Sequence, residues 1–587
     1  MKKIITDTYK NISNKHFLKN FINISYFISL IYLFILSLIL SYLFKFGIDL
    51  TDESSYILNS KKSILSSRLY NYDIFFNFQL YISNYNIQIF RITNLIFILI
   101  SNFILFSAFA HFLKKVFLLE LKKNFLFSLF FLFSFSYYSW LWLPTPSYNS
   151  YNLIFCNLFF GLILFLFESK KLEMTYSKNL IVKLLLLSLI TVLIFLSKST
   201  TGIILFLFLS FYIYFYSNLK LINMSSYILG VLVFFYVIIY LYFGNIIVFA
   251  NNFFDGIKAY SFLEGHNVFV KPFEYLSQLV KAILSIKFFC ITILFSLYFK
   301  LRKIDLNLNI DNLIFLIFCS IFLDFDKSIF VASIFLYNIY YLIIFYNENN
   351  KNFSIMILIS LMSLILALAF SFGTANNILI QSIMIISIIM VPLITFFYLK
   401  EFSNFFLLLL FLSMAYGLSN NIFLNIKDPY RVSKPLMENN FKIDLFLNNN
   451  KKISFFTDKY TNKFYRNFYL VFENHEWNYE NYIIDLSGTT PFINLAAPSK
   501  LISPWLIGGN KGSEDFAIHY LKKLKKSEFN NSAVILSDTD RRISKNVLEK
   551  VGFEFEKSHF LFKTIDGPFL FKKNIYEIYL PNKYYEK

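Results

Sequence analysis

The feature that most constrains this chain is a series of apolar runs that recurs from the N-terminus to about residue 420. A stretch of about 20 apolar residues has the length of a helix that crosses the hydrocarbon core of a bilayer. We expect such helices near residues 24–46, 90–112, 124–143, 150–167, 180–197, 201–217, 224–243, 282–299, 311–324, 328–346, 353–372, 377–399 and 404–420. The runs predict a polytopic α-helical membrane protein with about 11–13 transmembrane helices.

The charge of the chain fits a membrane protein better than a nucleic-acid-binding one. Of the 587 residues, 57% are hydrophobic and only 16% are charged, yet the net charge is +19. Most Lys and Arg residues lie in the short gaps between apolar runs, where they set topology and meet anionic lipid headgroups. No basic motif or recognition helix is present, so we expect membrane lipids as partners and no nucleic acid.

The gaps between runs alternate in charge, and this alternation predicts topology. Lysines cluster before the first run and in every second gap afterwards, whereas the alternate gaps hold few cations. The positive-inside rule therefore predicts a cytoplasmic N-terminus. With about 13 spans, the residues after 420 lie on the opposite side.

The chain divides into two parts by composition. Residues 1–420 form the expected membrane domain, with a long first outer loop at 47–89 and a second at 244–281. Residues 421–587 are more polar and predict an extracytoplasmic α/β domain, because β-like runs alternate with helical stretches. The predicted strands lie near 452–458, 469–474, 481–488, 532–538 and 576–581, and the predicted helices at 513–526, with Ser513 as N-cap, and 543–551.

Asp52 and Glu53 form the sharpest chemical feature. They follow the first apolar run directly and so lie at the outer membrane–water boundary. Carboxylates at such a position are costly unless they are solvated, paired or functional. The residues alone leave two interpretations open, a solvated cap of an interfacial helix and a catalytic site.

Several segments of the chain resemble the GT-C glycosyltransferase superfamily. The segment TDESSYILNS at 51–60 resembles the branch that contains protein O-mannosyltransferases and the aminoarabinose transferases of lipid A. Further likeness to bacterial membrane proteins of this type lies in residues 145–152, 196–203, 372–377 and 484–513. The layout of a long first loop, many helices and an outer C-terminal domain is also similar.

The resemblance implies an enzyme that moves a sugar from a polyprenyl-phosphate donor to a glycan, lipid or protein acceptor at the outer face of the membrane. It implies Asp52 as general base and Glu53 as a positioning carboxylate, and it leaves open a divalent cation held by these two residues. Candidate ligands of the donor phosphate are Lys61, Lys62, Arg68, Lys198 and His266, with Arg91 behind them. Candidate sugar or acceptor ligands are Tyr56, Tyr148, Asn149 and Asn376. The resemblance also implies a bacterial inner membrane, with residues 421–587 in the periplasm.

Two other classes of function stay open. A transporter or flippase for a lipid-linked glycan or small solute usually carries ionisable residues and broken helices near the middle of the bilayer. Here most runs are uninterrupted, Pro392 being an exception, and polar residues gather at the outer ends. This pattern favours chemistry at the interface over transport. A non-enzymatic envelope assembly protein is the third interpretation.

Overall fold

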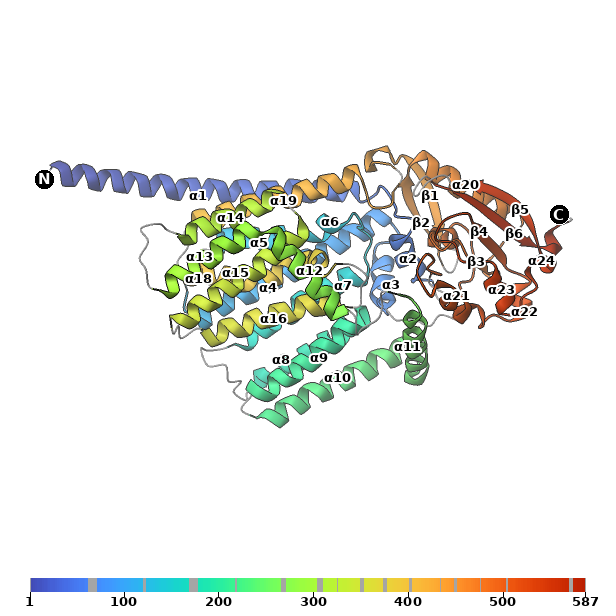
Figure 1. Ribbon diagram of the computed structural model, residues 1–587, viewed down its shortest axis with the longest axis horizontal. Coiled ribbons are helices and arrows are strands. Elements are labelled where there is room, and N and C mark those ends of the chain that lie inside the picture. The colour runs from blue at the N-terminus through green and yellow to red at the C-terminus, as the bar shows by residue number, and fades with distance from the viewer. Residues whose placement is uncertain are drawn as a thin grey trace.

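The computed structural model has two parts, a bundle of helices and a C-terminal region that holds all the strands (Figure 1). It describes residues 2–61, 71–119, 123–167, 178–216, 219–264, 271–302, 310–324, 326–348, 353–372, 377–400, 404–432, 434–447, 451–475, 477–502, 505–568 and 574–585. The C-terminal region packs against one end of the bundle, and α1 runs the full length of the bundle toward it.

The bundle is built from the helices up to residue 427. Its long helices are α1 (Lys2–Leu43), α4 (Ile87–Val116), α7 (Tyr148–Leu166), α8 (Lys178–Ser197), α9 (Ser199–Tyr216), α10 (Lys220–Phe243), α13 (Lys287–Leu301), α14 (Ile310–Asp324), α15 (Lys327–Asn347), α16 (Phe353–Ser371), α18 (Ile386–Leu399) and α19 (Asn404–Lys427). The remaining ones are α2 (Asp52–Leu58), α3 (Asp73–Ile82), α5 (Lys123–Phe133), α6 (Ser136–Trp140), α11 (Ile246–Ser261), α12 (Lys271–Ser285), α17 (Ile378–Ser382) and η1 (Ile383–Ile385).

Nine helices of the described chain are long and apolar enough to cross a membrane, or ten if the bent pair α12–α13 is one span. The chain is therefore a polytopic α-helical membrane protein. All thirteen predicted runs are helical, but four of them are too short, split or bent to count as one continuous membrane-spanning helix. The run at 124–143 is split by a turn at Ser134 and Phe135, α9 and α14 are short, and α13 meets α12 at an angle of 81°.

Gaps from the two sets lie at opposite ends of the bundle. Near the C-terminal region, Thr145 contacts Glu53 and Lys198 contacts the end of α16. At the far end, Lys300 pairs with Asp311 and Lys400 pairs with Glu348. Which compartment each end faces stays a prediction of the positive-inside rule.

The C-terminal region contains two sheets. Strands β1 (Phe441–Phe446) and β2 (Lys452–Thr457) form an antiparallel pair. The second sheet has the order β3-β4-β6-β5, with β3 (Ile483–Asp485), β4 (Ala533–Ser537), β5 (His559–Asp566) and β6 (Ile575–Pro581). Among the described strands of this sheet, β3 and β4 pair in parallel, and the pairs β4–β6 and β5–β6 are antiparallel. Around the sheets lie η2 (Leu436–Glu438), α20 (Lys459–Asn474), η3 (Pro491–Leu495), α21 (Ser513–Leu521), α22 (Lys526–Phe529), α23 (Asn546–Lys550), α24 (Phe555–Ser558) and η4 (Asn582–Tyr584).

Two local predictions for this region are wrong. Residues 469–474 were expected as a strand but complete α20, because Asp458 caps that helix by accepting from the backbone N–H groups of Tyr460 and Thr461. Ser513 is the first residue of α21 and not its N-cap, a position that Gly512 occupies. The Ser513 hydroxyl instead accepts from the N–H of Asn510.

Helix α11 and the residues just after it contact the C-terminal region. The end of α11 places Ala259 and Leu263 in one apolar core with Phe516 and Tyr520 of α21. One turn before Ala259 on α11, Asp255 pairs with His519 and Lys523. These contacts fix how the C-terminal region sits on the bundle.

Gly512 is a point where this connection can be tested. It has φ +84°, and a Cβ there would lie 1.9 Å from the carbonyl oxygen of Phe262 at the end of α11. Gly552 has φ +88° but open space around it, so it is a matched control for backbone strain alone. We expect Gly552→Ala to cost about 1–2 kcal/mol of stability. We expect Gly512→Ala to cost about 1–3 kcal/mol more, because the overlap must be relieved by separating α11 from α21. Equal thermal unfolding midpoints of the two purified variants would contradict this contact.

Candidate functional site

Helix α2, which carries Asp52 and Glu53, is preceded by a buried aspartate, Asp49, that contacts its first turn. The Asp49 carboxylate accepts from the hydroxyl and N–H of Thr51 and from the N–H of Glu53 at 2.8–3.1 Å. The first N–H groups of a helix have no partner within the helix, and Asp49 accepts two of them, that of Glu53 with its carboxylate and that of Ser54 with its backbone oxygen. Burial, and then the nearby charges of Asp52 and Glu53, raise the pKa of Asp49 well above its usual range. Asp49 thus fixes the position of its two acidic neighbours.

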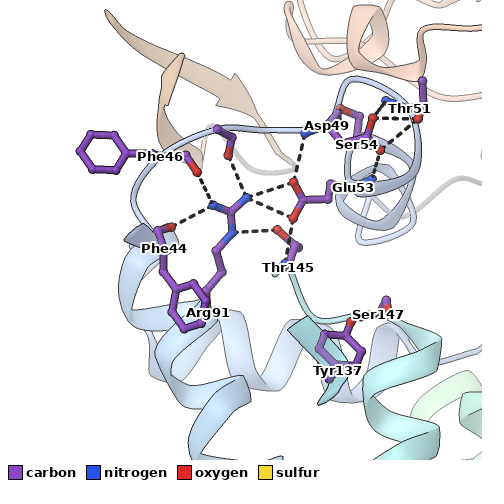
Figure 2. A network of polar contacts seen from close by, with 11 residues as sticks. Phe44, Phe46, Asp49, Thr51, Glu53, Ser54, Arg91, Tyr137, Thr145 and Ser147 are labelled. Carbon is purple, nitrogen blue, oxygen red and sulfur yellow. Dashed lines mark hydrogen bonds and ion pairs between the residues drawn. The ribbon is translucent and has the colours of Figure 1, made fainter. Parts of the chain in front are cut away.

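Glu53 is paired with Arg91 of α4 in the interior of the protein (Figure 2). The Arg91 Nη2 lies 3.1 Å from Oε1 and 3.2 Å from Oε2 of Glu53, and both side chains are at most 1% exposed. Glu53 Oε1 also accepts from the N–H of Thr145, and Oε2 accepts from the N–H of Asp49. Each carboxylate oxygen therefore has two donors.

The Arg91 guanidinium is satisfied to the same degree. Nη1 donates to the carbonyl oxygens of Phe44 and Phe46, Nη2 donates to that of Gly47, and Nε donates to Thr145 Oγ1. With Glu53 included, these partners match the five N–H donors of a guanidinium. Arg91 has no donor left for a phosphate, and Glu53 has no lone pair left for a substrate or metal. The pair instead fixes the chain between α1 and α2 to α4 and to the 141–147 loop.

Asp52 differs from its two acidic neighbours in its exposure. Asp49 and Glu53 are buried, whereas 33% of the Asp52 side chain is exposed. Its Oδ2 lies 3.7 Å from Nη1 of Arg431, which follows the last helix of the bundle and also donates to Thr51 Oγ1 at 2.8 Å. Desolvation on its covered sides raises the pKa of Asp52, and Arg431 and the Tyr430 hydroxyl offset only part of that rise. Asp52 is thus a carboxylate with raised basicity and an open side.

A second arginine reaches Asp52 from the C-terminal region. Arg541 is exposed and close enough for its charge to lower the pKa of Asp52. The backbone at Arg541 packs closely against the backbones at Gly488 and Gly508. A Cβ on either glycine would lie about 2 Å or less from the Arg541 carbonyl oxygen. The N–H of Gly508 also donates to the carbonyl of Gly488 at 3.0 Å. Glycine is required at both positions for this arginine loop to approach.

The candidate sugar ligands Tyr56 and Tyr148 lie together beside Asp52. Their rings are 6.0 Å apart in an edge-to-face arrangement, and the charge of Asp52 acts on both hydroxyls. Asn149 is buried on the first turn of α7, and its Oδ1 accepts from Nε2 of Gln381. The structure therefore brings Tyr56 and Tyr148 to Asp52 and gives Asn149 a partner within the bundle.

The two candidate phosphate lysines that the structure describes are both buried. Lys61 donates to the carbonyl oxygen of Asn494 in η3 at 2.8 Å, and burial lowers its pKa to about 7. Lys198 donates to the carbonyl oxygen of Phe370, while Thr201 donates to that of Ala369, so the 198–201 turn caps the C-terminal end of α16. Both lysines contribute to packing. The candidates Lys62, Arg68, His266 and Asn376 lie outside the described residues.

The donors expected for a divalent cation are only partly accessible. Hard cations such as Mg²⁺ and Ca²⁺ take oxygen ligands, chiefly carboxylates. Asp52 offers an open carboxylate, but the lone pairs of Glu53 are occupied by Arg91, Thr145 and Asp49. Within the described part of the chain, no group of three or more His, Cys, Asp or Glu side chains could hold a metal ion. The pair Asp52 and Glu53 therefore does not fit a metal.

Three residues of the candidate site are not among those that the sequence predicts, namely Asp49, Arg431 and Arg541. Asp49 stands two positions before Thr51, which occupies the N-cap of α2, so it is not at the usual capping position. Arg431 lies about 11 residues after the last predicted apolar run. Both local signals were weak. Arg541 carried no local signal, because only the packing of its backbone on two glycines brings it to the site.

Comparison of the chain with models of protein families, with curated proteins and with solved structures found no match.

Proposed function

We propose that this protein is a membrane glycosyltransferase of GT-C type, which moves a sugar from a polyprenyl-phosphate donor to an acceptor with Asp52 as general base. The observation that carries the proposal is the division among three neighbouring carboxylates. Asp49 and Glu53 are buried and saturated with donors, whereas Asp52 keeps an open side next to Arg431. A general base needs such access to its substrate, together with a pKa raised toward the working pH.

The groups around Asp52 match what an inverting displacement requires. The acceptor oxygen forms a bond to the anomeric carbon of the sugar as the bond from that carbon to the donor phosphate oxygen breaks. Asp52 takes the proton of the acceptor, and the electron pair of the broken bond leaves on the polyprenyl phosphate. Arg431 and Arg541 supply positive charge where that negative charge develops. The half-buried Tyr148, which packs on the buried ring of Tyr56, supplies an aromatic side chain for the sugar beside Asp52.

The position of the site suits a donor that is anchored in lipid. Asp52 follows α1 by nine residues, at the end of the bundle where the C-terminal region sits. We propose that this end faces the periplasm of a bacterial inner membrane and that residues 421–587 act there as an α/β domain. The polyprenyl tail would then stay in the bilayer while its phosphate reaches the two arginines.

The test of this function is sugar transfer by the full chain in liposomes. Radiolabelled polyprenyl-phosphate hexoses and pentoses are supplied with a membrane extract as acceptor, and labelled product is separated from donor. We expect one donor to give product that depends on the protein. Retention of every label on its donor, in liposomes where the protein is folded, would count against the proposal.

Arg431 provides a prediction about the donor. We expect Arg431→Gln to weaken binding of the polyprenyl-phosphate sugar about 10- to 100-fold, because a charge-assisted hydrogen bond contributes about 1.5–3 kcal/mol. Donor affinity is measured by equilibrium binding in detergent. The matched control is Arg466→Gln, since Arg466 is exposed on α20 in the C-terminal region. Equal affinities of the two variants would remove Arg431 from the phosphate site.

A further inference from the structure

The helices α11 and α12 differ from the spanning helices in direction and in what they expose. α12 meets the apolar helix α13 at 81°, so it lies nearly perpendicular to that helix. The αL residue Gly244 ends α10, Asn245 caps α11, and α11 then runs across the end of α10 instead of continuing it (Figure 1). Both helices therefore lie across the end of the bundle that carries the C-terminal region.

Each of the two helices has one exposed apolar face. On α11, Ile247 is 64%, Phe254 66% and Ile257 42% exposed, at successive spacings of seven and three residues that place them on a single helix face. On α12 the corresponding face holds Phe273, Leu276, Val280 and Leu284, which are 48–75% exposed. Apolar faces of this size are not left to water in a folded protein.

The opposite faces of these helices are already occupied. α11 packs Ala259 against α21, and its Asp255 pairs with His519 and Lys523. α12 buries Tyr275 and Ala282 in the main core of the bundle. The exposed apolar faces of α11 and α12 continue onto the neighbouring helices α10 and α13. Exposed side chains of those two helices, such as Leu241 and Phe288, are apolar, as in membrane helices.

We infer that α11 and α12 lie in the plane of the membrane, in the headgroup layer, with their exposed apolar faces inserted into the lipid. Such helices pair an apolar face with cations at its border. Here Lys258 of α11, Lys281 of α12 and Lys287 at the start of α13 are all exposed. The partner of this surface is the bilayer, with anionic lipid favoured at the lysines. The inference does not depend on the proposed reaction.

In this placement, the C-terminal region is attached to the membrane surface through α11. One face of α11 lies on lipid and another on α21, and the half-buried Tyr260 packs on Phe516 with ring centroids 5.5 Å apart. The hydroxyl of Tyr260 is also near that of Tyr148 beside Asp52. α11 therefore fixes the height of the Asp52 site above the lipid at the level where lipid phosphates lie.

The test measures how deeply each helix inserts. The full chain with Phe254→Trp or Phe273→Trp is reconstituted in phosphatidylcholine and phosphatidylglycerol vesicles brominated at acyl carbons 6,7 or 11,12. Fluorescence of the unsubstituted protein is subtracted to remove its four native tryptophans. Leu561→Trp is the control, because Leu561 is exposed on β5 of the C-terminal region.

We expect both added tryptophans to be quenched about twofold more by the shallow bromines than by the deep ones, because interfacial helices insert only ~5–10 Å. The control should show no quenching. If a substitution prevents folding, Ile257→Trp reports on the same face of α11. No quenching at positions 254 and 273 would overturn the inference and indicate water or a protein partner. Stronger quenching by the deep bromines would overturn it in favour of helices within the hydrocarbon core.

Discussion

Substitution of Glu53 by Gln is expected to lower the stability of the protein by about 3–5 kcal/mol, because it leaves the Arg91 guanidinium buried without a counter-charge. Arg91 is 0% exposed. The amide also replaces one acceptor oxygen by a donor, which would face the N–H of Thr145 or Asp49. The measurement is the thermal unfolding midpoint of the purified protein in detergent.

Two controls separate this effect from a general loss of charge. Glu480→Gln removes a carboxylate that pairs with Lys500 at 2.8 Å but is 81% exposed, and we expect an unchanged midpoint. The double variant Glu53→Gln/Arg91→Met removes both buried partners and should recover part of the loss. If Glu53→Gln were as stable as Glu480→Gln, the buried ion pair would not anchor α2.

Substitution of Asp52 by Asn is expected to reduce sugar transfer about 10²- to 10⁴-fold, the usual contribution of a general base. The unfolding midpoint should stay close to that of the wild type, since the pair with Arg431 is long and partly exposed. Transfer is measured as the initial rate with donor in excess. Asp515→Asn is the control, because Asp515 is an exposed carboxylate on α21.

The pH dependence of the rate gives the same prediction a second readout. A base acts in its deprotonated form, so the rate falls as the pH drops through its pKa. The pKa of Asp52 is raised from the usual 3.8, and the acid limb should therefore lie at higher pH than for an ordinary aspartate. The residual rate of Asp52→Asn should lack this limb. A limb of the same shape in the variant would assign it to another group.

The sequence was sufficient for the architecture of the bundle because a bilayer imposes a length on each apolar run. All thirteen runs form helices, and nine helices of the described chain are long and apolar enough to cross a membrane. It was less informative where tertiary context decides. Residues 469–474 have the composition of a strand, but Asp458 starts a helix that includes them.

At the site, the sequence identified the acidic pair, and the resemblance gave each residue a role, but the pairing of Glu53 with Arg91 was not predicted. Asp52 and Glu53 are adjacent, yet they point to different surroundings because α2 turns about 100° per residue. Which of the two meets Arg91 depends on α4 and the 141–147 loop, both distant in the sequence. Lys198 shows the same limit, since a lysine between two apolar helices suggested phosphate binding but caps α16.

The most direct test of this account compares Asp52→Asn and Glu53→Gln side by side, with transfer rate and unfolding midpoint measured on the same preparations. We expect Asp52→Asn to lose transfer and to keep its unfolding midpoint. We expect Glu53→Gln to lose several kcal/mol of stability, with any loss of transfer tracking the loss of folded protein. Full transfer by folded Asp52→Asn, or a stable Glu53→Gln protein that binds donor but transfers nothing, would contradict the assignment of chemistry to Asp52 and of structure to Glu53.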